Sequence, residues 1–453
     1  MPRVRQRLSA IRVGALRVGA LRVAALRVAA LPVAALLLAA ACSSAPSPPA
    51  PRALRDPTGL LGHSNLLYSS EIGAWEGAGG PAVTNPAVTG KIRAAKIPAI
   101  RFSVYDCFTG ERCGRDRHEG TQSRAAFQSA IRGITQTDGA IPWLKFLPVS
   151  RSNIHGIIGA IFCPPADGSD WAMNLPANKA VLAATAAAYH GPVILEDNNE
   201  AEYDCAPFWG YPTTGAPGVS TKLGDIYVAT MPALVADARR LGFSSVVTIG
   251  YLGISGGPGW GDPCTPDGSA PYGYDCAVPT RYVDEFNTAV HAAYLASHDN
   301  PDYLPEVESV HSYCHSTDFT SKPGYPVPDA MCYAWQREWL LMARAQVEQI
   351  WGNSIGSQIR FAVSEWSGGT YRTPADSWVG YRNGGMPPYV SGYLKMLEGD
   401  GKVTGSGTGY WGASLFQLAS NPQGNGYNLI EPDGSPSDYY AAFKAASLSG
   451  LKG

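Results

Sequence analysis

Short apolar runs alternate with longer segments of helical periodicity from about residue 57 to the end of the chain. Each short run is mainly apolar and carries few charges, which is typical of strands covered on both faces in a parallel sheet. The predicted strands are Asn65–Ser69, Ala99–Tyr105, Trp143–Pro148, Val193–Asp197, Ser245–Tyr251, Val307–Tyr313, Arg360–Glu365 and Tyr410–Gln417. The predicted helices are Asn85–Ala95, Thr121–Thr135, Leu175–Tyr189, Ile226–Leu241, Thr280–Ser297, Trp335–Trp351, Pro387–Glu398 and Ser437–Ala446.

Eight strand-helix units in about 400 residues predict an α/β protein of the (β/α)8 TIM-barrel type with long βα loops. No second linker or low-complexity stretch interrupts residues 57–453, so they are predicted to form one domain. A doubly wound open sheet also has alternating strands and helices, and it is the alternative fold.

The first 41 residues have the composition of an export signal. They contain seven arginines and no acidic residue, and an apolar run from Val28 to Ala41 ends them. Fourteen apolar residues are short for a bilayer span but fit the core of a signal peptide. The sequence before Cys42 resembles a bacterial lipobox, with Ala39 where Leu is usual. We predict a signal peptide at 1–41, lipidation of Cys42, a Ser/Pro linker at 42–56, and a cell-surface or secreted protein. Plain cleavage near Ala41 is the alternative.

The charge distribution argues against nucleic acid as a partner. Without residues 1–41 the chain has 28 basic and 37 acidic residues, a net charge of −9. Binding to phosphate backbones needs clustered Lys and Arg, and no basic stripe is present.

Eight cysteines remain beyond Cys42, and an even number in an exported chain indicates disulfides. Sequence proximity favours the pairs Cys107–Cys113, Cys163–Cys205, Cys264–Cys276 and Cys314–Cys332, all in loops after strands. The chain has no CxxC motif, and its only Cys/His cluster is His311, Cys314 and His315. We therefore predict neither a metal nor a cofactor.

Polar residues at the carboxyl ends of the predicted strands are the candidate site, because TIM barrels carry their chemistry there. Arg101 lies in the second strand, Glu200 follows the fourth, and Glu365 ends the seventh. Strands four and seven lie across a barrel from each other, so the two carboxylates can face one substrate.

Together with Asn199, His311, Tyr313 and Trp411, these residues resemble, in order and spacing, the retaining glycoside hydrolases of clan A, which are (β/α)8 barrels. The resemblance implies that Glu200 is the acid/base and Glu365 the nucleophile. The sequence differs from many members in having Ala201, where they have Pro after the acid/base. The residues implied to bind the sugar are Arg101, Asn199, His311, Tyr313 and Trp411.

The physical chemistry of these residues agrees with that implication. Retaining hydrolysis needs one carboxylic acid and one carboxylate about 5–5.5 Å apart. We expect Arg101 and Tyr313 to keep Glu365 ionised, and partial burial beside that charge to keep Glu200 protonated. Asn199 is expected to hold the sugar 2-hydroxyl.

The sequence also allows other roles for several of these residues. Arg101 could pair with Asp106, and His311 could be a satisfied core histidine. Glu202, Asp197 or Glu196 could replace Glu200 as the acid.

Tryptophans in or beside strand-end loops fit stacking on sugar faces, although each one also fits core packing. They are Trp75, Trp171, Trp209, Trp260, Trp366 and Trp411.

Two other functions compete with a glycosidase. The segment Gly253–Gly257 matches the G-x-S-x-G nucleophile elbow, which makes Ser255 the nucleophile of a serine acyl hydrolase. The residues that follow are rich in Gly and Pro and do not predict the helix that this motif requires. A surface barrel that binds polysaccharide without cleaving it is the non-enzymatic interpretation, although both carboxylates needed for cleavage are present.

Overall fold

The computed structural model describes most of the chain after residue 66, within a compact unit that runs from Pro51 to Gly453. The described residues are 67–72, 85–104, 107–113, 118–120, 123–137, 139–146, 175–198, 201–206, 209–212, 216–254, 265–266, 274–275, 277–312, 329–366, 386–398, 410–415, 418, 429–430, 434–437 and 440–450. The signal-peptide and linker predictions, and the lipidation of Cys42, lie outside them.

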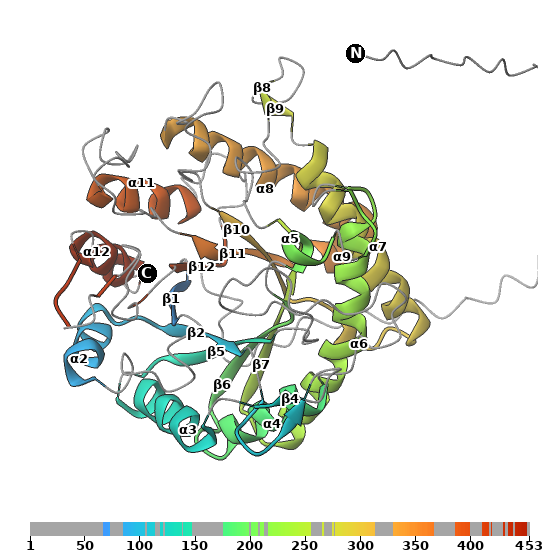
Figure 1. Ribbon diagram of the computed structural model, residues 1–453. Helices are drawn as coiled ribbons and strands as arrows, with labels where there is room; N and C mark the ends of the chain where they lie inside the picture. Colours follow the sequence, from blue (N-terminus) through green and yellow to red (C-terminus); the bar gives the residue numbers. More distant parts are fainter. Residues whose placement is uncertain are drawn as a thin grey trace, which may run out of the picture. The chain divides into compact units, whose positions relative to one another are not determined.

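Eight parallel strands close into a barrel, as predicted (Figure 1). β1 pairs with both β2 and β12 and so closes the ring. The closed ring is incompatible with the alternative of an open doubly wound sheet. In their order around the barrel the strands are β1 (Leu67–Ile72), β12 (Gly412–Leu415), β11 (Arg360–Trp366), β10 (Val307–Ser312), β7 (Ser245–Tyr251), β6 (Pro192–Glu196), β5 (Ile141–Phe146) and β2 (Ala99–Val104).

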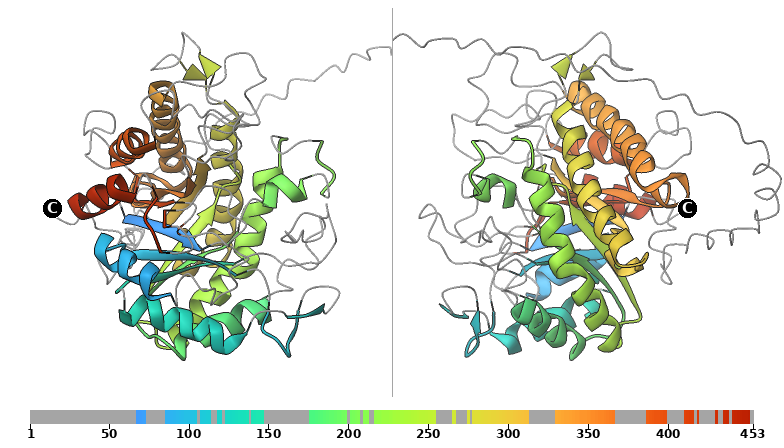
Figure 2. Two further views of the ribbon diagram at one scale, coloured as in Figure 1. Left: turned by 60° about the vertical axis from the view of Figure 1, so that its left-hand side comes forward. Right: turned by 90° about the vertical axis from the view of Figure 1, so that its right-hand side faces the viewer.

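Helices surround the strands on the outside of the barrel (Figures 1 and 2). The longer ones are α2 (Pro86–Ala95), α3 (Arg124–Arg132), α4 (Leu175–Ala186), α6 (Val219–Arg240), α7 (Ala277–Ala296), α8 (Asp329–Trp351), α11 (Met386–Glu398) and α12 (Tyr440–Gly450). Short elements are η3 (Gly133–Thr137), α5 (Ala201–Cys205), η4 (Pro301–Tyr303), α9 (Asn353–Gly356), the pair β3 (Arg112–Cys113) and β4 (His118–Glu119), and the pair β8 (Thr265–Pro266) and β9 (Tyr274–Asp275). The predicted helices match, except that α6 and α8 begin six or seven residues earlier.

Local sequence explains where the first helices start. The Asn85 side chain accepts a hydrogen bond from the Ala87 amide at 3.0 Å, and Pro86 occupies the first turn of α2. Ser123 caps α3 in the same way through the Ala126 amide. Both caps satisfy amides that the first helical turn leaves without partners, so these sequences start helices at defined positions.

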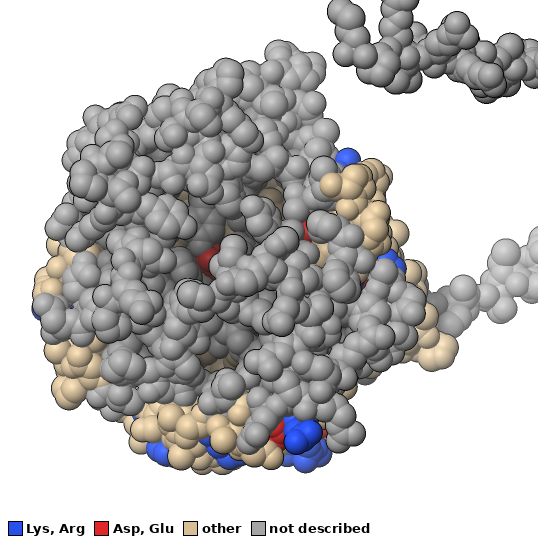
Figure 3. Space-filling view, viewed as in Figure 1, with Lys and Arg blue, Asp and Glu red and all other residues tan. Residues whose placement is uncertain are grey.

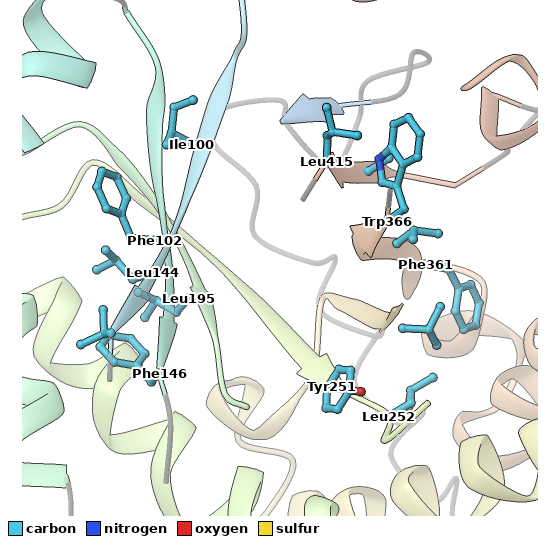
Figure 4. Close-up of a cluster of buried hydrophobic side chains, with 14 of the residues drawn as sticks. Ile100, Phe102, Leu144, Phe146, Leu195, Tyr251, Leu252, Phe361, Trp366 and Leu415 are labelled. Atoms are coloured by element: carbon cyan, nitrogen blue, oxygen red, sulfur yellow. The ribbon is translucent and has the colours of Figure 1, made fainter. Parts of the chain in front are cut away.

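The hydrophobic core has two layers, because side chains alternate between the two faces of each strand. The outer layer fills the space between strands and helices, and Phe102, Leu144 and Leu195 belong to it (Figure 4). The inner layer fills the barrel and consists of Ala99, Trp143, Ile194, Val247, Ile249, Val307, Ala362 and Trp411. Polar side chains on this inner face therefore meet one another in the centre of the barrel.

The side chains of two predicted disulfide cysteines are described, and Cys107 and Cys205 are each disulfide-bonded. Their partner sulfurs lie outside the described side chains, so all four pairings stay predictions. No described helix has the length and hydropathy needed to cross a membrane. The described side chains include no group of three or more His, Cys, Asp or Glu residues placed to hold a metal ion.

Candidate active site

Arg101 connects two carboxylates inside the barrel. It lies on β2 and is fully buried. Its Nε donates to Oε2 of Glu196 at 2.7 Å, and its Nη1 donates to Oε2 of Glu365 at 3.1 Å. Glu196 ends β6 and Glu365 is the penultimate residue of β11, and β7 and β10 lie between those strands in the ring. Asp106, the partner considered for Arg101 above, lies outside the described residues. One guanidinium therefore joins the carboxyl ends of two strands that are not neighbours.

Three side chains converge on Oε2 of Glu365. Besides Arg101, Nε2 of His311 lies 3.5 Å from this oxygen and Nζ of Lys145 lies 3.7 Å from it. The Glu365 residue is 7% exposed and Lys145 is 1% exposed, so these contacts form where water screens charges poorly. The arrangement holds a carboxylate in one place at the end of β11.

A β-bulge turns Glu365 into the barrel. Ala362 belongs to the inner layer, so regular alternation along β11 would point Ser364 inward and Glu365 outward. The pairing of β10 with β11 shifts at this point, because Val310 pairs with Val363 but the next residue, His311, pairs with Glu365. One extra residue on β11 reverses the alternation, and bulges commonly re-aim a side chain in this way.

The same reversal directs the side chain of the next residue, Trp366, to the outside of the barrel. It is fully buried and its ring stacks on Tyr393 of α11, with ring centroids 4.8 Å apart. It belongs to the outer layer, as Phe361 of the same strand does (Figure 4). Trp209, which is 7% exposed, also belongs to the outer core. These two tryptophans therefore have the core-packing role that the sequence also allowed, rather than lining a sugar-binding rim.

Glu196 is an ionised residue that holds Arg101. It is fully buried, its Oε2 also accepts a hydrogen bond from Nε1 of Trp143 at 2.9 Å, and its Oε1 accepts one from Oγ of Ser309 at 3.1 Å. Burial by itself raises the pKa of Glu196, but the charge and hydrogen bond of Arg101, with smaller effects of Lys145 and His311, outweigh it and lower the pKa. Glu196 does not fit the role of proton donor.

Asp197 and Glu202, which the sequence also allowed as the acid, both accept hydrogen bonds from Tyr251. Burial raises the pKa of Asp197 well above its usual value, opposed by the Tyr251 amide, which donates to Oδ1 at 2.9 Å. The Tyr251 hydroxyl donates to Oε1 of Glu202 at 2.8 Å. Asp197 is 3% exposed and Glu202 is 1% exposed. These two carboxyls thus attach the chain before and after residues 199–200 to the end of β7.

His311 contacts the charged groups rather than only core atoms. It is fully buried, and its Nε2 lies 3.4 Å from Nη2 of Arg101 as well as 3.5 Å from Glu365. Its ring lies against that of Tyr251, with centroids 4.9 Å apart. The structure brings His311 to the site, as expected.

Trp411 lies inside the barrel together with Trp143. It is 4% exposed, and the two rings are 6.2 Å apart at an angle of 57°. The guanidinium of Arg101 lies 5.8 Å from the Trp143 ring. Trp411 is thus within the same cluster as the carboxylates, and its stacking on a sugar stays a prediction.

The remaining predicted site residues lie outside the described part of the chain. They are Glu200, Asn199 and Tyr313, and the rival nucleophile Ser255 and the tryptophans Trp75, Trp171 and Trp260 also lie outside it. After β7 the described residues Leu252–Ile254 are not helical, and the next helix in the described part is α7, which starts at Ala277. A nucleophile elbow leads from its strand directly into a helix, and the residues that would form it, from Ser255 onward, lie outside the described residues.

Sequence reasoning missed Lys145, Trp143, Ser309 and Tyr251, and it treated Glu196 only as a possible acid. A signal for Lys145 was present, because it is the single charge in the apolar strand Ile141–Phe146. It follows Trp143 by two residues, which places both on the inner face of β5. On the face shown in Figure 3, acidic atoms are visible near the centre, and the basic side chains that are visible lie at the periphery.

Comparison with known proteins places the fold. No protein-family model matches the chain, and no curated protein matches it. Among solved structures it is similar to a GH5-4 broad specificity endoglucanase from an uncultured bacterium, with a TM-score of 0.52 and 12% identity over 87% of this chain and 95% of the other. A GH5 xyloglucan-specific endo-beta-1,4-glucanase from a metagenomic library has a TM-score of 0.48 and 12% identity over 86% and 98% of the two chains. A family 1 b-glucosidase from Thermotoga maritima has a TM-score of 0.47 and 10% identity over 85% and 97%. At such identities the likeness to the GH5-4 enzyme is one of fold, and it places this chain among the (β/α)8 barrels.

Proposed function

We propose that this protein is a retaining glycoside hydrolase that cleaves O-glycosidic bonds of a poly- or oligosaccharide. The observation that carries the proposal is the Glu365 carboxylate, which a bulge turns into the barrel and which Arg101, His311 and Lys145 hold by one oxygen. A fixed, ionised carboxylate at the end of a barrel strand has the properties of a nucleophile. The fold likeness to a GH5 endoglucanase supports the same class.

In the proposed mechanism a carboxylate oxygen of Glu365 attacks the anomeric carbon while Glu200 protonates the leaving oxygen. The C–O bond to the leaving group breaks, and a glycosyl ester forms on Glu365. Glu200 then takes a proton from water, the water oxygen attacks the anomeric carbon, and the ester bond breaks with its electron pair returning to Glu365. Arg101, Asn199, His311, Tyr313 and Trp411 are proposed to bind the sugar.

Two substitutions test this mechanism once a screen of aryl glycosides and polysaccharides has identified a substrate. Glu365→Gln should abolish turnover of every substrate, because no ester forms. Glu200→Ala should retain more activity on aryl glycosides with good leaving groups, and azide should accelerate it by replacing the water that Glu200 activates. Proton NMR of the first product should show retention of the anomeric configuration.

Other results would lead to other conclusions. Inversion in the NMR experiment would refute the double displacement. Equal losses of Glu200→Ala on activated and natural substrates, without an azide response, would move the acid to Glu202 or Asp197. Binding to a polysaccharide array without turnover of any glycoside would favour the non-catalytic barrel.

We further propose that the protein is exported and tethered by a lipid on Cys42, and that it contains the four predicted disulfides. Mass spectrometry of the exported protein should show an acylated N-terminal Cys42. An unmodified N-terminus downstream of it would show plain secretion. Peptide mapping without reduction should recover the pairs Cys107–Cys113, Cys163–Cys205, Cys264–Cys276 and Cys314–Cys332.

A further inference from the structure

Lys145 is a buried lysine in the candidate active site. It lies on β5, which is four steps from β11 in the eight-stranded ring and therefore opposite Glu365. Its Nζ reaches to 3.7 Å from Oε2 of Glu365, and the residue is 1% exposed. Lysine is rarely buried to this extent unless its charge is compensated by an acidic partner. Its position requires an explanation that core packing does not provide.

Charge balance in the cluster indicates when Lys145 matters. Among the described side chains, the cations Arg101 and Lys145 face the carboxylates Glu196 and Glu365. Arg101 contacts both acids, and Lys145 forms an ion pair with Glu365 and also lowers the pKa of Glu196 by its charge. When Glu365 is an ester it has no charge, so the cluster has lost one negative charge beside Lys145. The return of the carboxylate restores the balance.

We propose that Lys145 promotes the second half of the reaction, the departure of Glu365 from the sugar. This inference rests on the proposed function. In that step the bond between the anomeric carbon and the Glu365 oxygen breaks, and its electron pair becomes the negative charge of the carboxylate. Lys145 stabilises that charge as it develops, because a fixed cation in a site shielded from water acts strongly on it. In the first half the same attraction disappears as Glu365 is esterified, so Lys145 does not accelerate ester formation.

Lys145→Met tests this division, because Met preserves an unbranched side chain and removes the charge. The probe is a dinitrophenyl glycoside of the sugar that the wild-type protein cleaves, since its leaving group makes ester formation fast. We expect kcat to fall by about 100-fold, the order seen when one charge-stabilising donor is removed. KM should fall by the same factor, because the ester accumulates, and kcat/KM should stay within about threefold. A rapid burst of dinitrophenol should precede the slow steady state, and azide should accelerate that steady state.

A fall in kcat/KM as large as that in kcat, with KM unchanged and no burst, would overturn the proposal. Lys145→Gln carries the same prediction if Lys145→Met does not fold. Lys179→Met is the matched control, because Lys179 forms an ion pair with Asp237 at 3.3 Å in the outer helices, and its kinetics should equal those of the wild type. Labelling wild-type Glu365 with a 2-deoxy-2-fluoro glycoside separates the two hypotheses. An unlabelled Glu365 peptide would refute the proposed function itself, whereas a labelled peptide with normal Lys145→Met kinetics would refute only the role of Lys145.

Discussion

Arg101 and Glu196 form a fully buried ion pair at 2.7 Å, between side chains that come from β2 and β6. The two strands are not adjacent, because β5 lies between them. The pair also orients the guanidinium that contacts Glu365. Its integrity therefore affects both the stability of the barrel and the position of the proposed nucleophile.

Glu196→Gln should destabilise the protein by about 3–5 kcal/mol, because it leaves the buried charge of Arg101 without its closest counter-charge. Turnover should fall as well, since Arg101 is then free to shift away from Glu365. Urea unfolding and kcat/KM measure the two effects. Arg240→Gln, which breaks an ion pair with Asp237 on a side chain 70% exposed, should cost less than about 1 kcal/mol. Similar losses in both variants would contradict the structural role given to Glu196.

Glu308 should make the stability depend on pH. It lies fully buried on β10, and burial raises its pKa to about 8. In the unfolded chain the carboxyl titrates near 4.5. Between these values the folded protein holds a proton that the unfolded chain has lost, so stability falls as pH rises, by up to about 1.4 kcal/mol per pH unit.

Glu308→Gln removes this titration, so the variant should lose less stability than the wild type between pH 5 and pH 8. Urea unfolding of both proteins at the two pH values provides the comparison, in which all other titrating groups cancel. Parallel losses in the two proteins would show that Glu308 does not carry the effect.

Tyr251→Phe should weaken the attachment of α5 to the barrel. The change removes the hydrogen bond from the Tyr251 hydroxyl to Glu202 but leaves the ring against His311. We expect a loss of about 1–3 kcal/mol, because a fully buried carboxyl loses a donor. Turnover of natural substrates should fall more than that of activated ones, since the segment before α5 contains Glu200.

Tyr440→Phe is the control for this variant. The Tyr440 hydroxyl donates a hydrogen bond to the Lys91 carbonyl at 2.7 Å and so joins α12 to α2. These two helices lie in another part of the barrel wall than Glu365. The variant should cost about 1 kcal/mol or less and leave the ratio of the two activities unchanged. An equal change of that ratio in both variants would rule out a specific role of Tyr251.

The elements of the barrel were predictable from the sequence because each strand is a compact apolar run. β7 has the predicted bounds, and β2 and β10 begin at the predicted residues. Arg101, His311 and Glu365 were identified from their places at strand ends and from the family resemblance. Lys145 and Tyr251 were not identified, and Glu196 was considered only as a possible acid, because the sequence does not show which inward side chains of separate strands meet inside the barrel. The direction of the Trp366 side chain was not predictable, because an apolar run does not reveal a bulge and regular alternation from Ala362 would point Trp366 inward.

The bulge in β11 also means that two different chain lengths can place Glu365 inside the barrel. Ser364 is the extra residue, and deleting it would restore the regular two-residue repeat from Ala362, in which Glu365 still points inward. A scan of substitutions never changes this spacing and therefore never tests the bulge. A homologue lacking one residue here would be expected to keep its nucleophile on a regular strand, so a gap of one residue in an alignment at this point does not indicate a lost site.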